Sequence, residues 1–292
     1  YFTNGTCAGN SREEALVQGM SEIMERHYTL RALDEGIALP DIPEAYLKRF
    51  SAYDILEGLR RDDRFRVLVK DCSYGTGFPV VMVALIDRKT HGCIVKSGAH
   101  PVFEIALERT LTELFQGRRL TDAGSASVPA VTPAEAASAV NRHNVLKNAS
   151  GSYALPFFTG KSADPFVSFP DRTTMDNKQL YDYCMTLFRE KGLRVWVRDW
   201  NCLGFRTYQI LVPGFSEIYT AARLREKHSQ YRAERTLRDM PGASEDDLRA
   251  LMNYMRYKEG FSLENTISYT LGQPALDDAV KDMGLFAHAG MC

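Results

Sequence analysis

The segment that decides the fold runs from Asn4 to Arg26 and reads NGTCAGNSREEALVQGMSEIMER. Ser11 and Glu14 have the spacing of a capping box, which predicts a helix over residues 12–30. An α-helix turns by about 100° per residue, so the apolar residues of this segment form an arc and leave a polar face opposite it. The polar face carries Glu14, Gln18, Glu22 and Glu25.

The acidic face of this predicted helix lacks lysine partners four residues along, so its carboxylates repel one another unless a cation binds them. Mg²⁺ fits such a face, because it takes one or two carboxylates and completes its shell with water and substrate phosphates. The preceding glycines would let backbone N–H groups approach an anion at the helix start. The alternative is a face that contacts only solvent.

The composition is that of a globular protein, with 45% hydrophobic and 25% charged residues among 292. The net charge of -1 gives no field toward nucleic acid or an anionic membrane, and no apolar run approaches the roughly 18 residues of a membrane span. The six cysteines show no Cys-x-x-Cys spacing, which argues against a zinc site or a disulfide framework. We therefore expect a cytoplasmic protein that binds neither membranes nor nucleic acid directly.

Helical and strand patterns alternate along the chain, which predicts an α/β (α+β) fold with mixed sheets and flanking helices. The expected strands are RVLVKD, FPVVMVALID, CIVKSGA, RVWVRDW and FRTYQILVPG. Small and polar residues dominate residues 121–156, which favours a linker-like segment. From about Ile218 the pattern is helical. We therefore expect one domain over residues 1–225, including the linker-like segment, and a helical extension over 226–292.

The clearest helix is expected within HPVFEIALERTLTELFQGRRL, with Pro101 at its first position. Arg109 and Glu113 lie on the same side of it, but arginine before glutamate is the weaker order for an i,i+4 ion pair. A surface pair is the structural alternative. Functionally, Arg109 could hold a phosphate through two hydrogen bonds, and Glu113 could orient it or bind a metal. His100 is expected to cap the helix, and with Ser97 it could border such a site.

The segment LPFFTGKSAD imitates the end of a Walker A phosphate-binding loop. Its Gly160-Lys161-Ser162 run has the right order, but Leu155 stands where the first glycine belongs, and the following ADPF does not open a helix. We therefore reject a P-loop at this position.

The basic stretch RLREKHSQYRAERTLR would place Arg225, Arg232 and Arg235 on one side of a helix. Such a side could contact RNA or an acidic partner. A solvated basic face is the favoured explanation of the pattern, so no function is assigned to it.

Two long segments resemble the signature of the YcaO family, whose members use ATP to activate peptide backbone amides. They are TNGTCAGNSREEALVQGMSEIMERH and SGAHPVFEIALERTLTELFQGR, and FPVVMVALID and YQILVPGFSEIYTAARL fit the same family. The likeness is closer to the accessory factor linked to β-methylthiolation of a ribosomal protein than to azoline-forming cyclodehydratases. Those commonly end in a proline-rich tail, whereas this sequence ends AHAGMC.

The resemblance implies a role for each matching residue. Asn10 and Gln18 would contact nucleotide or its metal, Glu22 and Glu25 would bind Mg²⁺, and Arg26 would reach phosphate. From the second helix, Arg109 would contact nucleotide and Glu113 would complete the metal site, and both would act in catalysis.

The family's remaining nucleotide contacts lie in an amino-terminal half that this sequence lacks, so the resemblance implies a site of which only half is present. The sequence starts at Tyr1 and stops near the start of the helices that follow the catalytic domain in such proteins, so both ends are expected to be truncated. The implied partners are a peptide or ribosomal protein substrate, a modifying enzyme and a second copy in a homodimer. The alternative is a non-catalytic module that docks a methylthiotransferase-type enzyme.

Overall fold

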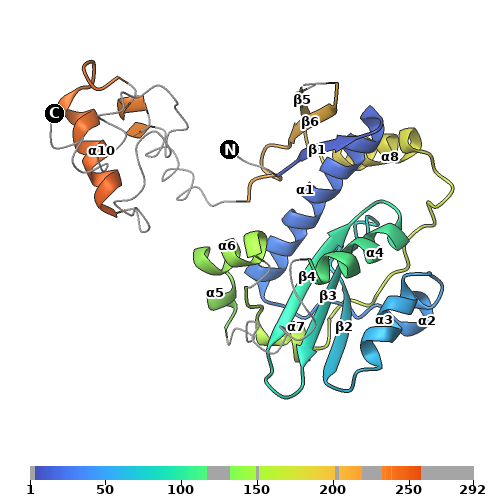
Figure 1. Cartoon of the computed structure of the whole chain (residues 1–292). Coiled ribbons are helices and arrows are strands. Elements are labelled where there is room, and N and C mark those ends of the chain that lie inside the picture. The colour runs from blue at the N-terminus through green and yellow to red at the C-terminus, as the bar shows by residue number, and fades with distance from the viewer. Residues whose placement is uncertain are drawn as a thin grey trace. The chain divides into compact units, whose positions relative to one another are not determined.

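The computed structural model describes residues 4–116, 132–148, 151–200, 204–218, 232–233, 235–237 and 239–257. The chain divides into two compact units, Tyr1–Ile218 and Tyr219–Cys292 (Figure 1). Among the described residues, no helix is both long enough and apolar enough to cross a membrane.

Three strands form an antiparallel sheet with the order β2-β3-β4. They are β2 (Phe65–Asp71), β3 (Val80–Asp87) and β4 (Cys93–Ala99), as the strand pattern predicted. The β3–β4 turn is closed by the Asp87 carboxylate, which accepts hydrogen bonds from the backbone N–H groups of Lys89 and Thr90. The central strand β3 is buried at every position but one, because elements cover both faces of the sheet.

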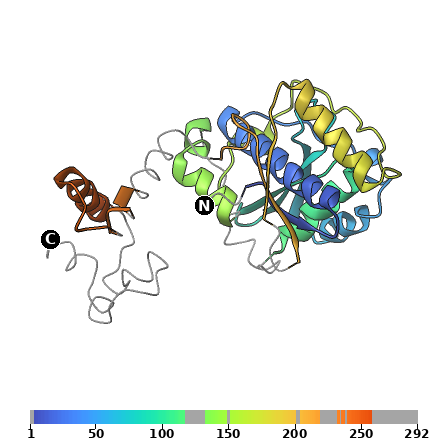
Figure 2. The ribbon, with the colours of Figure 1, turned by 90° about the horizontal axis from the view of Figure 1, so that it is seen from above.

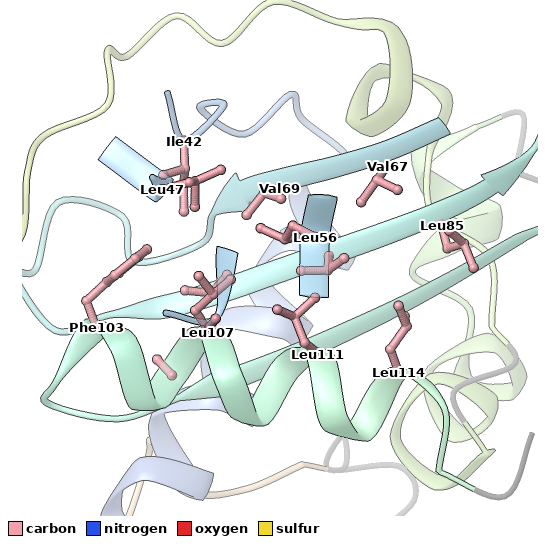
Figure 3. Packing of buried hydrophobic residues seen from close by; sticks show 14 of the residues in the cluster. Ile42, Leu47, Leu56, Val67, Val69, Leu85, Phe103, Leu107, Leu111 and Leu114 are labelled. Atoms are coloured by element: carbon pink, nitrogen blue, oxygen red, sulfur yellow. The ribbon is translucent and has the colours of Figure 1, made fainter. Parts of the chain in front are cut away.

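One face of this sheet packs against α2 (Glu44–Leu47), α3 (Tyr53–Arg60) and α4 (Phe103–Leu114). Figure 3 shows the side chains of α4 interdigitating with those of the strands. The apolar stripe of α4 faces the sheet, as its spacing predicted. The helix begins at Phe103, two residues later than expected, because Val102 is still extended. The stripe consists of Phe103, Leu107, Leu111 and Leu114.

A second antiparallel sheet has the order β1-β6-β5 and lies on the far side of the long helix α1. Its strands are β1 (Thr6–Gly9), β5 (Trp196–Asp199) and β6 (Arg206–Leu211). Helix α8 (Asn177–Glu190) runs beside α1 (Figure 2). Gly19 lets α1 approach β1 closely, since a Cβ there would lie 2.7 Å from the Cys7 sulfur.

The helix α1 spans Arg12–Glu35 and is the central element of the first unit. Between two sheets and α8 it is buried around much of its circumference, so its apolar arc is wider than the four residues expected from spacing. All four are fully buried: Leu16, Met20, Ile23 and Met24. The charged residues of α1 lie on the remaining polar side, where they are half-buried or exposed.

Both ends of α1 differ in detail from the prediction. The Ser11 hydroxyl accepts a hydrogen bond from the Glu14 N–H at 3.1 Å, but the Glu14 carboxylate accepts from the N–H of Asn10, so only half of the expected capping box forms. The helix continues five residues beyond residue 30. It ends at Gly36, which adopts the left-handed conformation with φ 58°, as a helix terminator commonly does.

The segment expected to be linker-like over residues 121–156 is largely helical where it is described. Helices α5 (Pro133–Ala136), α6 (Ala139–Asn148) and α7 (Leu155–Thr159) follow one another. A complete capping box between Thr132 and Glu135 starts α5. The small residues that suggested a linker include many alanines, and alanine is the strongest helix former. The linker prediction is therefore wrong for these helices, of which α5 and α6 pack against α1.

In the second unit, α10 covers Glu245–Tyr257 and agrees with the expected helix. Arg232 and Arg235, read from sequence as a basic face, both contact the Asp247 carboxylate, at 2.8 and 3.5 Å. Arg232 and Arg235 therefore belong to an ion-pair network within this unit. Arg225 lies outside the described residues, as does much of the extension over 226–292, whose boundaries stay a prediction.

The α/β fold class with flanking helices is confirmed. The sheets were expected to be mixed, but every strand pair that the structure describes is antiparallel. The connections between β2, β3 and β4 are short, and this explains their antiparallel pairing, since neighbouring parallel strands need a longer crossover.

Candidate functional site

The strand β4 forms one edge of its sheet among the described strands, and the candidate site lies along it. Helices α1 and α4 both pack on β4, and their polar side chains meet beside it. The Arg109 guanidinium on α4 donates a hydrogen bond from Nη1 to the Gln18 side-chain oxygen on α1. The two motifs recognised in the sequence are thus joined by a direct contact across 91 positions.

A cavity of about 220 Å³ lies at this edge. Side chains from four parts of the chain form its walls, and the polar ones predominate. Its lining residues are Glu25, Arg26 and Thr29 from α1, Val95, Lys96 and Ser97 from β4, Glu113 and Gln116 from α4 or just after it, and Val145, Leu146 and Tyr153 from α6 and the segment after it.

Glu25 is the central acidic group of this cavity. Its Oε1 accepts a hydrogen bond from the Ser97 hydroxyl at 3.0 Å. Burial, together with the nearby Glu113 carboxylate, raises the pKa of Glu25 to about 7, against the opposing effects of Arg26, Ser97 and Arg109. The pocket therefore holds two carboxylates, and the half-buried Glu25 lacks sufficient positive charge around it. A divalent cation would stabilise the ionised form of both.

The donor set of Glu25 and Glu113 suits Mg²⁺, a hard cation that binds through one or two carboxylates and leaves coordination positions for phosphate oxygens and water. Within the part of the chain that the structure describes, no group of three or more His, Cys, Asp or Glu residues is arranged to hold a metal. A Mg²⁺ ion here would depend on oxygen ligands from elsewhere in addition to these two carboxylates.

Glu22 is oriented differently from Glu25. Its Oε1 accepts a hydrogen bond from Arg26 Nε at 2.9 Å, and its Oε2 accepts one from the Gly5 N–H at 3.3 Å. Both carboxylate oxygens thus have protein partners, and Glu22 does not line the cavity. The Glu22–Arg26 spacing is the favourable i,i+4 order, so this ion pair was visible in the sequence. For Glu22 to bind a metal, this ion pair would have to open.

Asn10 and Gln18 also lie outside the cavity lining. Asn10 is exposed at the start of α1, where its side-chain amide donates to Glu14 Oε1 at 3.3 Å. Gln18 holds Arg109, as described above. Of the seven residues expected at the site, the structure places Glu25, Arg26 and Glu113 around one cavity, while Arg109 and Gln18 form an adjacent pair. The remaining two are engaged in other contacts.

Three lining residues were not identified from the sequence. Lys96 is half-buried, and no ion pair to it is seen among the described residues. The Thr29 hydroxyl is buried and has no hydrogen-bond partner in the described part of the chain. Tyr153 is buried beside them. A strand pattern cannot tell which face of an edge strand borders a site, so Lys96 carried no signal beyond its position next to Ser97.

Two other residues considered in the sequence analysis, His100 and Lys161, do not line the cavity beside β4. His100 Nδ1 accepts a hydrogen bond from the Val102 N–H at 3.1 Å. The N-cap residue of α4 is Val102, without a side-chain capping bond, so His100 contacts the start of the helix but does not cap it as predicted. Burial, assisted by the nearby Arg109, lowers the pKa of His100 to about 4, so the ring is neutral. Lys161 is exposed and follows α7 rather than preceding a helix, which agrees with the rejection of a P-loop.

Comparison with known families decides the wider assignment. The family model for YcaO cyclodehydratases, described as ATP- and Mg²⁺-binding, matches residues 1–216. The chain belongs to the YcaO family. The YcaO match spans both motif helices and the two sheets of the first unit. ATP and Mg²⁺, expected from the sequence, are the cofactors by which this family is described.

Two curated relatives are similar over the same region. The ribosomal protein S12 methylthiotransferase accessory factor YcaO of Escherichia coli (strain K12) is 36% identical over 222 residues, which are 76% of this chain and 37% of the relative. An uncharacterized protein of Haemophilus influenzae (strain ATCC 51907 / DSM 11121 / KW20 / Rd) is 34% identical over 221 residues, with the same coverage of each chain. The chain thus spans just over a third of the length of these relatives.

Among solved structures, the heterocyclase TruD is similar with a TM-score of 0.57 and 22% identity. The similarity covers 73% of this chain and 29% of that one. At this identity the likeness supports the YcaO-type fold and carries no functional detail.

Proposed function

We propose that this chain provides part of an ATP- and Mg²⁺-dependent site that phosphorylates a backbone amide of a peptide or protein. The wider role we propose is that of a cytoplasmic accessory factor in the modification of a ribosomal protein. The observation that carries the proposal is the cavity beside β4, where Glu25, Glu113 and Arg26 converge from two helices. Membership of an ATP- and Mg²⁺-binding family and the name of the E. coli relative support it.

In this proposal Glu25 and Glu113 hold Mg²⁺, which when bound would neutralise negative charge on the phosphates. Arg26 and Arg109 bind phosphate oxygens, because guanidinium groups match their geometry with two parallel hydrogen bonds. Gln18 positions Arg109 through the hydrogen bond between them. Glu22 remains a proposed metal ligand that would act after its ion pair with Arg26 has opened. Asn10 would contact nucleotide only after moving from its present contact with Glu14.

The proposed reaction transfers the terminal phosphoryl group of ATP to the oxygen of an amide, with ADP as the leaving group. A nucleophile then attacks the amide carbon. The bond between this carbon and the phosphorylated oxygen breaks, and phosphate leaves with the original carbonyl oxygen. Positioning and electrostatic stabilisation supply most of the catalysis in phosphoryl transfer. The residues of this chain therefore need to place positive charge and metal ligands, and no covalent step on a protein side chain is required.

A chimera tests the proposal directly. Residues 1–216 of this chain would replace the matching segment of the E. coli relative, and Mg²⁺-dependent ATP hydrolysis would be measured. We expect hydrolysis in the chimera and a loss of at least tenfold with Glu25→Gln or Arg109→Ala. Glu108→Gln, an exposed change next to Arg109, is the matched control and should have no effect. Equal rates in all four proteins would contradict the proposal.

The alternative function, a non-catalytic docking module for a methylthiotransferase-type enzyme, is favoured by the description of the E. coli relative as an accessory factor. The chimera separates the two functions in cells that lack their own copy of that relative. If modification of ribosomal protein S12 persists when Glu25 and Glu113 are both changed to glutamine, the docking function is supported. Sedimentation of the chimera would test the proposed homodimer.

A further inference from the structure

A second and larger cavity, of about 590 Å³, lies at the end of β2. Its walls come from the extended segment 37–40 after α1, the loop 73–77 after β2 and the extended segment 162–170. None of its lining residues lines the cavity beside β4. Its volume is within the range of sites that bind small organic molecules.

The lining of this cavity is mostly apolar, and its charged groups are all negative. Its apolar lining residues include Ile37, Leu39, Val167, Phe169 and three prolines. The charged lining groups are Asp71 and Asp164, and none of the lining residues is Lys, Arg or His. A nucleotide or another anion would find no counter-charge in such a cavity, whereas a cation would.

Asp71, the last residue of β2, is the informative group. It is 6% exposed, and the Ser73 N–H donates a hydrogen bond to its Oδ1 at 2.8 Å. Burial raises the pKa of Asp71, and only hydrogen bonds from Ser73 oppose this. Among the described residues, no Lys, Arg or His lies within ion-pair distance of its carboxylate. The neighbouring Lys70 pairs with Asp41 instead, at 2.8 Å.

Asp87, at the end of the adjacent strand β3, provides a comparison within the same sheet. It is also buried, but Arg64 Nε donates to its carboxylate at 2.6 Å, and turn N–H groups donate as well. These partners lower the pKa of Asp87 to about 2. The chain thus neutralises one buried aspartate internally, while the other borders a cavity and lacks a cationic partner.

We propose that the cavity at the end of β2 binds a protonated amine attached to an apolar body. The ammonium group would pair with the Asp71 carboxylate, and the apolar body would contact Leu39 and Phe169. Ile37 and Val167, which are 44% and 65% exposed, would be covered by the bound molecule. The amine could belong to a small molecule or to the amino terminus of a peptide, and both present the same group.

The wall beside Asp71 is held in place before any ligand binds. Tyr74 adopts the left-handed backbone conformation with φ 52°, which is uncommon for a residue with a side chain. The Arg31 guanidinium lies over the Tyr74 ring, 4.0 Å from its centroid, and also pairs with Glu35 at 2.7 Å. Arg31 is thereby engaged with other groups, and the wall is pre-organised, which lowers the entropic cost of binding.

The test uses the 292-residue chain and three probes that share one phenyl body: 2-phenylethylammonium, 2-phenylethanol and 3-phenylpropionate. Binding would be measured by calorimetry and saturation-transfer NMR. We expect the ammonium probe to bind at least tenfold more tightly than the carboxylate probe. Asp71→Asn should reduce this preference to about twofold, because the substitution removes the charge and preserves the shape. Comparison of phenylalanyl-alaninamide with its N-acetylated form then separates a peptide terminus from a free amine.

A second variant keeps the test valid if Asp71→Asn disturbs the fold. Val167→Trp changes an exposed residue at the cavity mouth and should weaken binding of the ammonium probe at least fivefold. Val140→Trp, an equally exposed valine on α6 that does not line the cavity, is the matched control and should leave binding unchanged. Equal affinity for the three probes, preference for the anion, or unaltered binding by Val167→Trp would overturn the proposal.

Discussion

Arg109 on α4 donates a hydrogen bond to the side-chain oxygen of Gln18 on α1, and this contact joins the two motif helices beside the edge of β4. It fixes the guanidinium next to the cavity that holds Glu25 and Glu113. The position of Arg109 therefore depends on a neutral residue from the other helix. A phosphate ligand would find the guanidinium already oriented.

The first prediction concerns this pair. Gln18→Leu removes the acceptor and leaves Arg109 mobile, so Mg-ATP affinity in the chimera should fall about three- to tenfold. Arg109→Ala removes the charged contact itself, worth roughly 1.5–3 kcal/mol, and should cost about ten- to a hundredfold. In the double variant the loss should equal that of Arg109→Ala alone, because Gln18 acts through Arg109. Additive losses in calorimetry would show that Gln18 contacts the nucleotide independently.

The second prediction concerns the pH dependence of stability in metal-free buffer. The pKa of Glu25 is about 7 in the folded chain, above its ordinary value of 4.5. Between these pH values the folded state binds more protons than the unfolded state, so the contribution of Glu25 to stability is lost as the pH rises from 4.5 through 7. Glu25→Gln should therefore raise the free energy of unfolding at pH 8 by roughly 1–3 kcal/mol, and by much less at pH 5.

Urea unfolding at the two pH values checks this expectation, with Glu108→Gln as an exposed control that should change neither value. Adding Mg²⁺ at pH 8 should stabilise the wild-type chain more than the Glu25→Gln chain, since only the former has the half-buried carboxylate that a cation would neutralise. A variant less stable than wild type at pH 8 would mean that Glu25 already has sufficient counter-charge within the protein.

The third prediction separates Glu22 from Glu25 on α1. Glu22→Gln and Glu25→Gln should each lower nucleotide-dependent activity of the chimera by a large factor if both bind Mg²⁺. Glu22→Gln also weakens the ion pair with Arg26, so part of its effect would come through that arginine. Comparison with Arg26→Ala and the double variant separates the two contributions. Activity at the wild-type level in both single variants would contradict the proposal that this helix binds Mg²⁺.

The fourth prediction concerns Lys161. Because its Gly-Lys-Ser run follows α7 and opens no helix, Lys161→Ala should leave Mg-ATP binding by the chimera within about twofold of wild type. Lys96→Ala is the informative comparison, since Lys96 lines the cavity beside Glu25 and should contribute to phosphate binding. A strong loss with Lys161→Ala would identify a phosphate site that the absence of the first glycine led us to reject.

Much of the fold could be predicted from local patterns. The apolar spacing of α4 and the short apolar runs of β2, β3 and β4 are set by burial on a defined face, so periodicity revealed them. The helices of the segment around α6 escaped prediction because small residues carry no strong periodic signal. In that segment, helix propensity and contacts with α1 decide the structure.

The candidate site could be predicted only in part, for a related reason. Glu25 and Glu113 stand on helix faces that the spacing defined, and the family resemblance selected them. Lys96, Thr29 and Tyr153 join them through tertiary packing, which brings together elements far apart in sequence. The pairing of Glu22 with Arg26 shows the opposite case, because its i,i+4 spacing is a local signal and the partner is an arginine rather than a lysine.

The last prediction is that the 292-residue chain alone binds Mg-ATP weakly or not measurably. The match covers 37% of the E. coli relative, and from the sequence we expect further nucleotide contacts in the part of such proteins that is not matched. Each charge-assisted contact is worth roughly 1.5–3 kcal/mol, so the lack of three or four would take a micromolar site beyond the measurable range.

The structure adds a physical reason for this weakness. Around the half-buried Glu25 carboxylate, the neighbouring Glu113 opposes ionisation, and Arg26 is shared with Glu22. Mg-ATP binding would therefore have to ionise Glu25 and draw Arg26 away from its partner without the compensating contacts. Calorimetry on the chain at pH 8 decides the matter, with the chimera as the positive control. Micromolar affinity in the chain alone would show that the cavity beside β4 suffices, and that the remaining contacts are dispensable for binding.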